Sequence, residues 1–328
     1  MLNRTQQTLQ KIASAKVLCL GDLMLDRYIY GLATRLSPEA PVPIINVKRK
    51  THMPGGLGNV VMNVKSLGGA PMAVGLAGRD AEAETLKLLL EKAVDPLSPP
   101  LIQDPDRPTT IKTRIIAGIQ QVARFDEESQ SPLSDQATAR YQQAVLSRLD
   151  DVSAVVLSDY GKGVLSTRMC AWVLDQADKR GKPVVVDPKG SDYGRYRGAD
   201  LVTPNRQELA LAAGRDIARS PQEVLTEAGL ELMKRHGLKN LLITRSEDGM
   251  TLLLNSGEVR HFPTKAKEVF DVSGAGDTVV AAMSCALAAN LSLEAGAEIA
   301  TLAAAIVVGK VGTATATAKE ILDSLSQN

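Results

Sequence analysis

The sequence predicts an α/β protein with a mostly parallel central sheet, helices on both faces of that sheet, and a second, smaller set of strands. Short runs of Val, Leu and Ile recur along the chain, which is typical of buried parallel strands. Stretches with apolar residues at helical spacing lie between these runs, and this alternation predicts a layered fold. Two further stretches alternate polar and β-branched residues and predict strands outside the main sheet.

The first element is KVLCLGD, residues 16–22, an apolar run that Gly and Asp bring to an end. Similar runs recur as AVVLSD, PVVVDP, DLVTPN and NLLITR, and all five are predicted strands of the central sheet. Each run ends near a polar residue, in order Asp22, Asp159, Asp187, Asn205 and Thr244. Any one of these side chains could simply cap the next helix. Together they favour a cleft, because open α/β sheets bind ligands at the carboxyl ends of their strands.

Residues 27–50 and 108–128 are the two stretches without helical spacing. They predict antiparallel strands that form either a lid over the cleft or a pairing surface. Exposed edge strands need a cover, so we expect a homodimer through this lid. The Pro-rich residues 98–108 are predicted to be a surface connection, and residues 165–181 to be an amphipathic helix that stops at Lys-Arg-Gly.

Charge and cysteine content exclude several classes of protein. The 38 Lys and Arg residues nearly balance 37 Asp and Glu residues, so no overall field attracts nucleic acid or an anionic membrane. The three cysteines are far apart, which argues against a disulfide framework or a zinc site. No leader peptide or membrane-spanning run is evident, and we expect a cytoplasmic protein.

The segment DVSGAGD, residues 271–277, combines glycines with an acid at the start of an apolar helix. Gly274 and Gly276 allow the backbone to approach a ligand, and the free N–H groups of a helix start bind anions. Asp277 in the first helical turn could accept a proton from an attacking hydroxyl. The alternative is a glycine turn in which Asp277 only caps the helix.

The second glycine-rich segment is PGGLGN, residues 54–59. Gly55, Gly56 and Gly58 permit close approach, and the amide of Asn59 suits sugar hydroxyls. The glycines could also serve only to start a buried helix tightly. The chain has no GxxxxGK[ST] motif, and Val61 stands where a dinucleotide-binding fingerprint needs its third glycine.

These segments together resemble the ribokinase-like (PfkB) carbohydrate kinases, with TPNRQE (203–208) and LLITRSEDG (241–249) lying between the two glycine motifs. The resemblance covers residues 15–318. Val272 departs from the Thr that is usual in the family. Within the family, the strings GDLMLDRYIYG, RLSPEAPVPIINV, RFDEE, SDYGKGVL and DPKG are similar to the D-glycero-β-D-manno-heptose 7-phosphate kinases of lipopolysaccharide synthesis.

The resemblance implies a three-layer sandwich with a β lid, and a single kinase domain over residues 1–328 with lid strands inserted at about 27–50 and 108–128. It implies a stand-alone kinase without the nucleotidyltransferase to which some heptose kinases are fused. The implied reaction is ATP-dependent phosphorylation of heptose 7-phosphate at O1. Another sugar or sugar phosphate as substrate, or a sugar-binding regulator without turnover, stays open as an alternative.

The resemblance also implies roles for individual residues. Asp277 would be the general base, with Gly274, Ala275 and Gly276 as the anion hole. The sugar would be bound by Asp22, Gly55, Gly56 and Asn59, and the nucleotide by Thr244, Ser246, Gly249 and Gly312, the last closing over the adenosine. Asn205 and Glu208 would organise Mg²⁺ and the ATP phosphates, largely through water. A monovalent cation such as K⁺ is expected near Asp271.

A 7-phosphate group needs cations that a neutral sugar does not. The candidates are Arg27, Lys112, Arg114, Arg124 and Lys162. Each alone could be an ordinary solvated surface residue. We expect two or three of them to converge.

Overall fold

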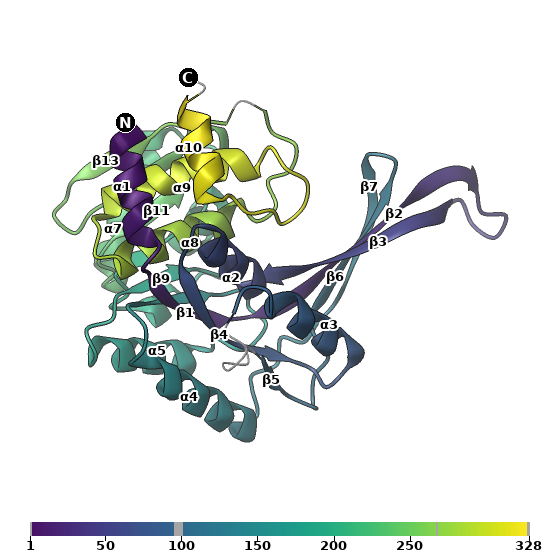
Figure 1. Ribbon diagram of the computed structural model, residues 1–328, viewed down its shortest axis with the longest axis horizontal. Helices are drawn as coiled ribbons and strands as arrows, with labels where there is room; N and C mark the ends of the chain where they lie inside the picture. Colours follow the sequence, from purple (N-terminus) through teal and green to yellow (C-terminus); the bar gives the residue numbers. More distant parts are fainter. Residues whose placement is uncertain (1, 95–100, 267, 327–328) are drawn as a thin grey trace.

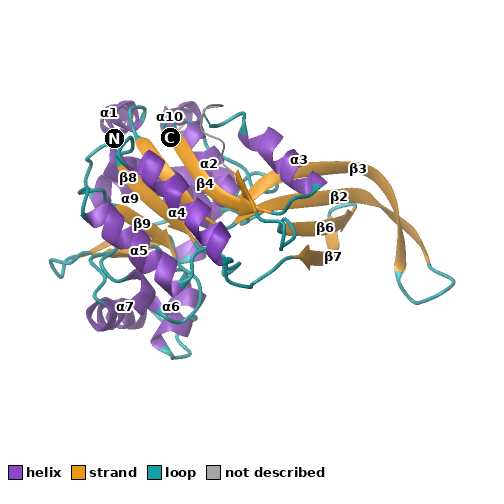
Figure 2. Ribbon diagram, turned by 90° about the horizontal axis from the view of Figure 1, so that it is seen from below, coloured by secondary structure: helices purple, strands orange, loops and turns teal. Residues whose placement is uncertain are grey.

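The computed structural model describes residues 2–94, 101–266 and 268–326. Within them, a nine-stranded sheet has the order β13-β12-β11-β10-β9-β8-β1-β4-β5 (Figures 1 and 2). Neighbouring strands are parallel except for the antiparallel pairs β11–β12 and β12–β13. The strands are β1 (Lys16–Gly21), β4 (Ala70–Ala77), β5 (Leu101–Gln103), β8 (Ala154–Ser158), β9 (Val184–Asp187), β10 (Leu201–Val202), β11 (Leu241–Thr244), β12 (Met250–Leu253) and β13 (Val259–Phe262).

All five predicted strands of the central sheet are confirmed, as β1, β8, β9, β10 and β11. Four strands were not predicted: β4, whose run APMAVGLA is interrupted by Pro71 and Gly75, and the short strands β5, β12 and β13. Residues 98–100 of the predicted Pro-rich connection lie outside the described residues. Residues 101–103 form β5 at the sheet edge, so the connection is shorter than expected.

Helices cover both faces of the central sheet. One core contains side chains of α1 (Leu2–Ile12), α2 (Leu57–Ser66), α3 (Ala81–Leu90), α8 (Ala275–Ala288), α9 (Leu293–Val307) and α10 (Ala318–Ser326). The other contains those of α4 (Asp135–Leu149), α5 (Thr167–Asp178), α6 (Arg206–Ala213) and α7 (Gln222–His236). The helix α5 confirms the prediction for residues 165–181.

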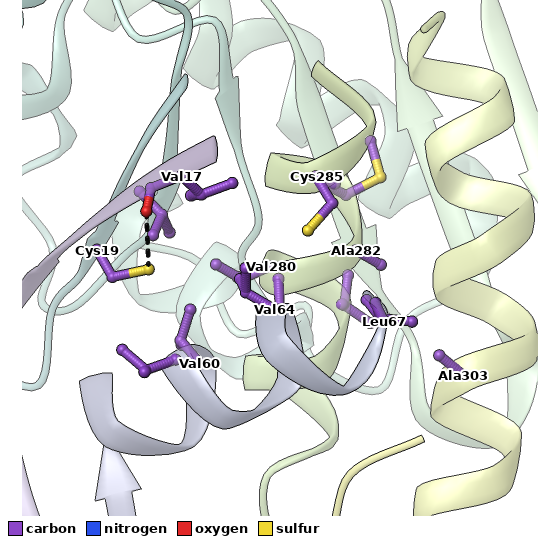
Figure 3. Packing of buried hydrophobic residues seen from close by; sticks show 14 of the residues in the cluster. Val17, Cys19, Val60, Val64, Leu67, Val280, Ala282, Cys285 and Ala303 are labelled. Carbon is purple, nitrogen blue, oxygen red and sulfur yellow. Dashed lines mark hydrogen bonds between the residues drawn. The ribbon is translucent and has the colours of Figure 1, made fainter. Parts of the chain in front are cut away.

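The alternation of side chains along β1 explains the three layers. Val17 and Cys19 pack with α2 and α8 on one face (Figure 3), while Leu18 and Leu20 belong to the core on the other face. Successive side chains of a strand point to opposite faces, so a run buried on both sides is apolar throughout. No helix in the described part of the chain is long and apolar enough to cross a membrane.

The second sheet projects from the body of the molecule (Figure 1). Its four strands have the order β3-β2-β6-β7, with bounds β2 (Leu23–Leu36), β3 (Pro43–Gly56), β6 (Ile111–Ala117) and β7 (Gln120–Glu127). This confirms a lid built from the two predicted stretches. The expectation of antiparallel strands is wrong for one pair, because β2 and β6 run parallel. The long segment between β3 and β6 returns the chain to the same end of the lid, which allows parallel pairing.

Candidate active site

The start of α8 approaches α2 closely and leaves an open space in front of it. Gly274 has a φ of 80°, and a Cβ added there would overlap with Nδ2 of Asn59, so this approach requires glycine. A Cβ added to Gly276 would meet no described atom within 4 Å. The N–H groups of Gly276 and Asp277 have no acceptor among the described residues. They are therefore free to bind an anion.

Asp277 is buried in this first turn, with 3% of its surface exposed. Asn59 Nδ2 donates to Asp277 Oδ2 at 2.8 Å, and the Tyr160 hydroxyl donates to Oδ1 at 2.7 Å. Burial raises the pKa of Asp277 to about 6, although these two hydrogen bonds lower it and the negative charge of Asp26 raises it. At neutral pH the carboxylate is ionised and able to accept a proton.

A second layer of hydrogen bonds fixes the amide of Asn59. Asn63 Nδ2 donates to the Asn59 side-chain oxygen at 3.1 Å and to its backbone oxygen at 2.9 Å. Thr278 Oγ1 in turn donates to Asn63 Oδ1 at 3.0 Å. The amide nitrogen of Asn59 therefore faces Asp277. Both the nitrogen and the oxygen of this amide are hydrogen-bonded within the protein. Asn59 is therefore placed to orient the Asp277 carboxylate rather than to bind a sugar directly.

Asp22 and Asp26 have different neighbours. Asp22 Oδ2 accepts the N–H groups of Tyr160 at 2.9 Å and Lys162 at 3.1 Å, and Oδ1 accepts that of Val164 at 3.2 Å. Its carboxylate thus holds the loop after β8 that carries Tyr160. Asp26 instead lies against Gly55, where an added Cβ would overlap with Asp26 Oδ2. Gly56, with a φ of 54°, follows directly and starts α2.

Asp26 and Tyr160 were missed by the sequence analysis. Asp26 stands four residues after Asp22 in GDLMLD, and that repetition of acids was the available signal. Tyr160 directly follows the strand-end residue Asp159, but nothing in the sequence connects its hydroxyl with Asp277, 117 positions later. Asn63 and Thr278 were missed for the same reason, since 215 positions separate them.

Four of the five candidate cations converge on one face of the lid. Residues paired across β2, β6 and β7 share a face, which puts Lys112, Arg114 and Arg124 beside Asp26. Lys162, from the loop after β8, lies 2.7 Å from Glu128. More cations converge than the two or three that we expected.

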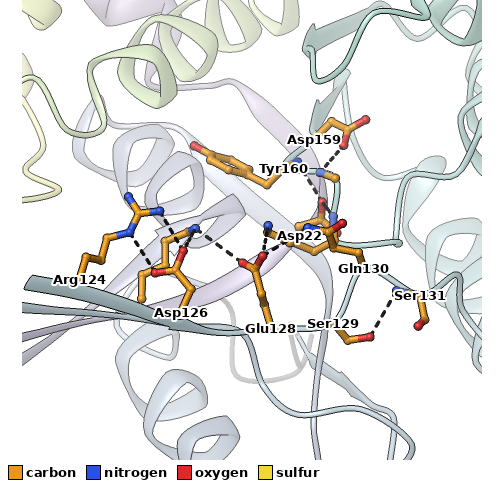
Figure 4. A network of polar contacts seen from close by, with 12 residues as sticks. Asp22, Arg124, Asp126, Glu128, Ser129, Gln130, Ser131, Asp159 and Tyr160 are labelled. Atoms are coloured by element: carbon orange, nitrogen blue, oxygen red, sulfur yellow. Dashed lines mark hydrogen bonds and ion pairs between the residues drawn. The ribbon is translucent and has the colours of Figure 1, made fainter.

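Asp126 and Glu128 (Figure 4), together with Asp26, neutralise most of this positive charge. Arg124 forms a two-point pair with Asp126, at 3.0 and 2.9 Å. Lys112 lies 3.2 Å from Asp126 and 3.8 Å from Glu128, and Arg114 forms an ion pair with Asp26. The hydrogen bonds and positive charges of their cationic neighbours lower the pKa values of Asp126 and Glu128.

Arg27 does not join this cluster. Its guanidinium lies 3.0 Å from Glu82 of α3 and donates to His52 at 3.3 Å. Because Arg27 is the neighbour of Asp26 on β2, it points to the opposite face of the lid. Its predicted contact with a substrate phosphate is not supported by this position.

Asn205 and Glu208 form a capping box at the start of α6. Asn205 Oδ1 accepts the Glu208 N–H at 2.9 Å, and Glu208 Oε2 accepts the Asn205 N–H at 3.1 Å. Glu208 Oε1 lies 3.2 Å from Lys189 Nζ. Burial raises the pKa of the nearby Asp187 well above its usual range, as do the negative charges of Asp277 and Glu208.

Asp187 and Glu208 are candidate residues for holding a metal ion. In residues 2–94, 101–266 and 268–326, no three His, Cys, Asp or Glu side chains are grouped closely enough to hold a metal ion by themselves. Mg²⁺ usually keeps several waters and takes further oxygens from substrate phosphates. The mutual repulsion of Asp187, Glu208 and Asp277, which Lys189 offsets only in part, fits a cation that is held in this way.

The remaining predicted nucleotide residues divide into two groups. Thr244 ends β11 and forms a parallel bridge with Asn205, and Ser246 and Gly249 follow with φ angles of 54° and 81°. Gly312 lies elsewhere: its N–H donates to Asp271 Oδ2 at 2.9 Å, and a Cβ there would lie 3.2 Å from Met53 Sδ. Met53 belongs to β3, so Gly312 is beside the lid.

Comparison with known proteins gives matches over almost the whole chain. The family model described as pfkB family carbohydrate kinase matches residues 14–320. The bifunctional protein HldE of Paramagnetospirillum magneticum is 44% identical over 324 residues, which cover 99% of this chain and 66% of that protein. HldE of Caulobacter vibrioides is 46% identical, with coverages of 94% and 63%. The chain thus spans slightly less than two thirds of the length of these curated relatives.

Solved structures with the same fold are more distant in sequence. Phosphofructokinase-2 from Escherichia coli in complex with substrates and products has a TM-score of 0.76 at 21% identity, covering 96% of this chain and 99% of that one. Ribokinase from Arabidopsis thaliana, complexed with ribose and ATP, has a TM-score of 0.72 at 20% identity, with coverages of 95% and 98%. The agreement extends to the small sheet as well as the central one and establishes a ribokinase-like fold.

Proposed function

The chain belongs to the pfkB family of carbohydrate kinases, and from this premise we propose that it transfers the γ-phosphoryl group of ATP to O1 of D-glycero-β-D-manno-heptose 7-phosphate. The products are the 1,7-bisphosphate and ADP. One observation carries the proposal: a buried carboxylate, Asp277, is held by Asn59 and Tyr160 beside free N–H groups at the start of α8. Such a site can remove a proton and stabilise phosphoryl charge in one place.

In the proposed reaction, Asp277 accepts the proton of the O1 hydroxyl as that oxygen bonds to the γ-phosphorus. The bond between the γ-phosphorus and the bridging oxygen breaks, and ADP leaves with the bonding electrons. The N–H groups of Gly276 and Asp277 donate to the oxygens of the transferring group, with Gly274 and Ala275 shaping this anion hole. The dipole of α8 adds to the same stabilisation.

The sugar is proposed to bind between the lid and α2. Gly55 allows Asp26 to lie close to the start of α2, and Asp26 is the carboxylate that can accept the hydroxyl groups of the sugar. Asp22 supports this site indirectly, because its carboxylate holds the loop that carries Tyr160. Asn59 is proposed to act on the sugar through Asp277, which it orients.

The 7-phosphate is proposed to bind at the lid cations Lys112, Arg114, Arg124 and Lys162. Without a substrate, these four cations are matched by Asp26, Asp126 and Glu128. A phosphate group competes with these carboxylates for the same donors and offers more acceptor oxygens. The resemblance of the sequence to heptose 7-phosphate kinases and the identity to HldE proteins support this substrate.

The nucleotide is proposed to lie over Thr244, Ser246 and Gly249, with its phosphates directed to α8 and Gly312 closing the site from the lid side. Asn205, Glu208 and Asp187 would hold Mg²⁺, mostly through water. When bound, Mg²⁺ neutralises part of the charge on the phosphates. A monovalent cation such as K⁺ is proposed near Asp271, whose carboxylate fixes the N–H groups of Ser273 and Gly312.

We also propose that one kinase domain carries both substrates, that the protein works in the cytoplasm, and that it forms a homodimer through the lid. Large apolar side chains on the lid support the dimer, since Leu32, Val47 and Phe125 are 46–49% exposed and Leu36 is 66% exposed. Light scattering at working concentration tests it, and a monomer there would overturn it.

The experiment for the reaction is ADP release with mass detection of the sugar product. Purified protein, Mg²⁺ and ATP are tested against both anomers of heptose 7-phosphate, with fructose 6-phosphate, ribose and adenosine as competing candidates. We expect turnover that is specific to the β-anomer. Turnover on another sugar alone would keep the kinase and reject the heptose. Binding of ATP without any phosphorylated product would favour the sugar-binding regulator.

A further inference from the structure

A pocket of about 450 Å³ lies behind the loop that follows β11. It is lined on one side by Arg245 and Asp248 of that loop and on the other by Arg206, Arg219, Gln222 and Glu223. None of these residues belongs to the proposed sugar, metal or phosphoryl-transfer sites. The pocket and the nucleotide site share only the segment 244–249. A pocket of this size is within the range that binds small molecules.

The guanidinium of Arg245 is buried and incompletely paired. Only 6% of Arg245 is exposed, and within the described residues its guanidinium makes one hydrogen bond, from Nη2 to the backbone oxygen of Asp248 at 2.7 Å. Its Nε has no partner among the described residues. Asp248 and Glu223 lie near this guanidinium, but within the described chain neither carboxylate forms an ion pair with it. Burying an incompletely paired charge is costly, so this guanidinium at the pocket wall favours an anion in the pocket.

Two more features of the pocket favour a negatively charged ligand. The helix α7, 15 residues long, starts at Gln222 after Pro221, and no side-chain hydrogen bond caps it. Its first N–H groups therefore add a partial positive charge at the pocket wall. Arg219 is exposed and has no hydrogen bond or ion pair within the described chain.

The acids of the pocket do not cancel this charge. Glu223 and Asp248 face three arginines, and Asp248 is already paired with Arg206. Arg206 Nη1 also donates to the Ser220 carbonyl at 3.3 Å, which holds the segment that carries Arg219. The three arginines and two acids leave the pocket with one net positive charge. This charge and the uncapped N–H groups at the start of α7 can bind an anionic ligand.

We propose that this pocket is a second anion site, which binds the phosphate group of a small phosphorylated molecule through Arg206, Arg219 and Arg245. The site is separate from the kinase centre, and its existence does not depend on the sugar that is phosphorylated. Its occupancy is linked to the nucleotide loop, because Arg206 and Arg245 both bind Asp248, two residues from Ser246. By linkage, an anion that draws on these donors and a nucleotide on the loop change each other's affinity.

The test is calorimetric titration of the whole protein with inorganic phosphate, in the presence of Mg²⁺ and a saturating non-hydrolysable ATP analogue that blocks the phosphoryl-transfer site. Arg124→Ala is titrated alongside, and any phosphate binding that this variant loses is assigned to the lid cations rather than to the pocket. We expect phosphate to bind the wild type in the millimolar range. Arg219→Ala should weaken this binding by about tenfold or more, because a charge-assisted contact is lost. Arg219 is exposed and unpaired, so this variant should fold normally, which a thermal melt checks.

Arg215→Ala is the matched control. Arg215 lies four residues earlier, outside the pocket, and pairs with Glu231 at 3.3 Å. We expect it to leave phosphate binding unchanged. Equal phosphate affinity in the wild type and in Arg219→Ala would overturn the proposal, as would the absence of any phosphate binding to the wild type. Either of those results would leave the proposed kinase reaction untouched.

Discussion

The hydroxyl of Tyr160 donates a hydrogen bond to Oδ1 of Asp277 over 2.7 Å. Burial raises the pKa of this carboxyl group to about 6, and the bonds from Tyr160 and Asn59 limit the rise. The two bonds occupy one lone pair on each carboxylate oxygen, so in the proposed mechanism the acceptor hydroxyl binds at a remaining lone pair or displaces Tyr160. In that mechanism Tyr160 would position Asp277 and, by lowering the pKa of its carboxyl group, would influence the pH at which Asp277 can accept a proton.

Replacing Tyr160 by Phe removes a bond that stabilises the ionised carboxylate, so the pKa of Asp277 should rise above its present value of about 6. A base must be deprotonated to act, and the acidic limb of the profile of kcat/KM against pH should move to higher pH. Tyr193→Phe is the control, because the buried Tyr193 hydroxyl has no partner among the described residues. Identical profiles for all three proteins would contradict the role of Tyr160.

Asp277→Asn should stabilise the fold at neutral pH. The pKa of Asp277 is raised from 3.8 to about 6, so the folded state binds the proton more tightly than the unfolded state does. The wild type therefore loses stability, relative to the variant, as the pH rises from about 4 through 6, by about 3 kcal/mol in total. Urea unfolding of both proteins across this range measures the difference. If the variant is equally or less stable than the wild type at pH 7, the ionised Asp277 carboxylate does not destabilise the fold, and the prediction is wrong.

The two glycines at the start of α8 should respond to alanine in different ways. Gly274→Ala places a methyl group against Asn59 and needs a φ of 80°, so both stability and activity should fall. Gly276→Ala meets no described atom within 4 Å. Its melting temperature should stay the same or rise slightly, because alanine favours helix.

For Gly276→Ala we nevertheless expect kcat to fall by about a hundredfold, since the methyl group takes the space of the transferring phosphoryl group. Thermal melts and steady-state rates of the two variants separate the two effects. Normal turnover by Gly276→Ala would show that the phosphoryl group lies elsewhere.

Arg124→Ala should raise the KM for a phosphorylated sugar by about tenfold while changing kcat little, because a charge-assisted contact to the phosphate is lost in ground state and transition state alike. Arg27→Ala is the matched control on the other face of the lid, where Arg27 pairs with Glu82. Its KM should equal that of the wild type. The reverse pattern would place the phosphate on the opposite face.

Local patterns were enough to predict the main architecture. Apolar runs buried on both faces identified β1, β8, β9, β10 and β11, and the absence of helical spacing identified the lid. The strand β4 was missed because its Pro71 and Gly75 interrupt the run, although parallel neighbours bury it. The parallel pairing of β2 and β6 depends on the path of the intervening chain, which no local pattern reveals.

Only the local part of the candidate site could be predicted from the sequence. The glycines and the acid at the start of α8 are adjacent in the sequence, and their local conformation follows from their residue types. The hydrogen bond from Asn59 to Asp277 spans 218 positions and is set by how α2 packs against α8. The choice between Asp22 and Asp26, and between Arg27 and its neighbours, depends on the face to which each side chain of β2 points. That face becomes known only with the bounds and register of the strand.

The most direct test of the account compares Asp277→Asn with the wild type in turnover of heptose 7-phosphate, together with the affinity of each for an ATP analogue. We predict a loss of about a thousandfold or more in kcat, with analogue binding nearly unchanged, because the variant lacks the base but keeps the anion hole. Turnover within a few-fold of the wild type would show that Asp277 is not the proton acceptor and would contradict the proposed mechanism.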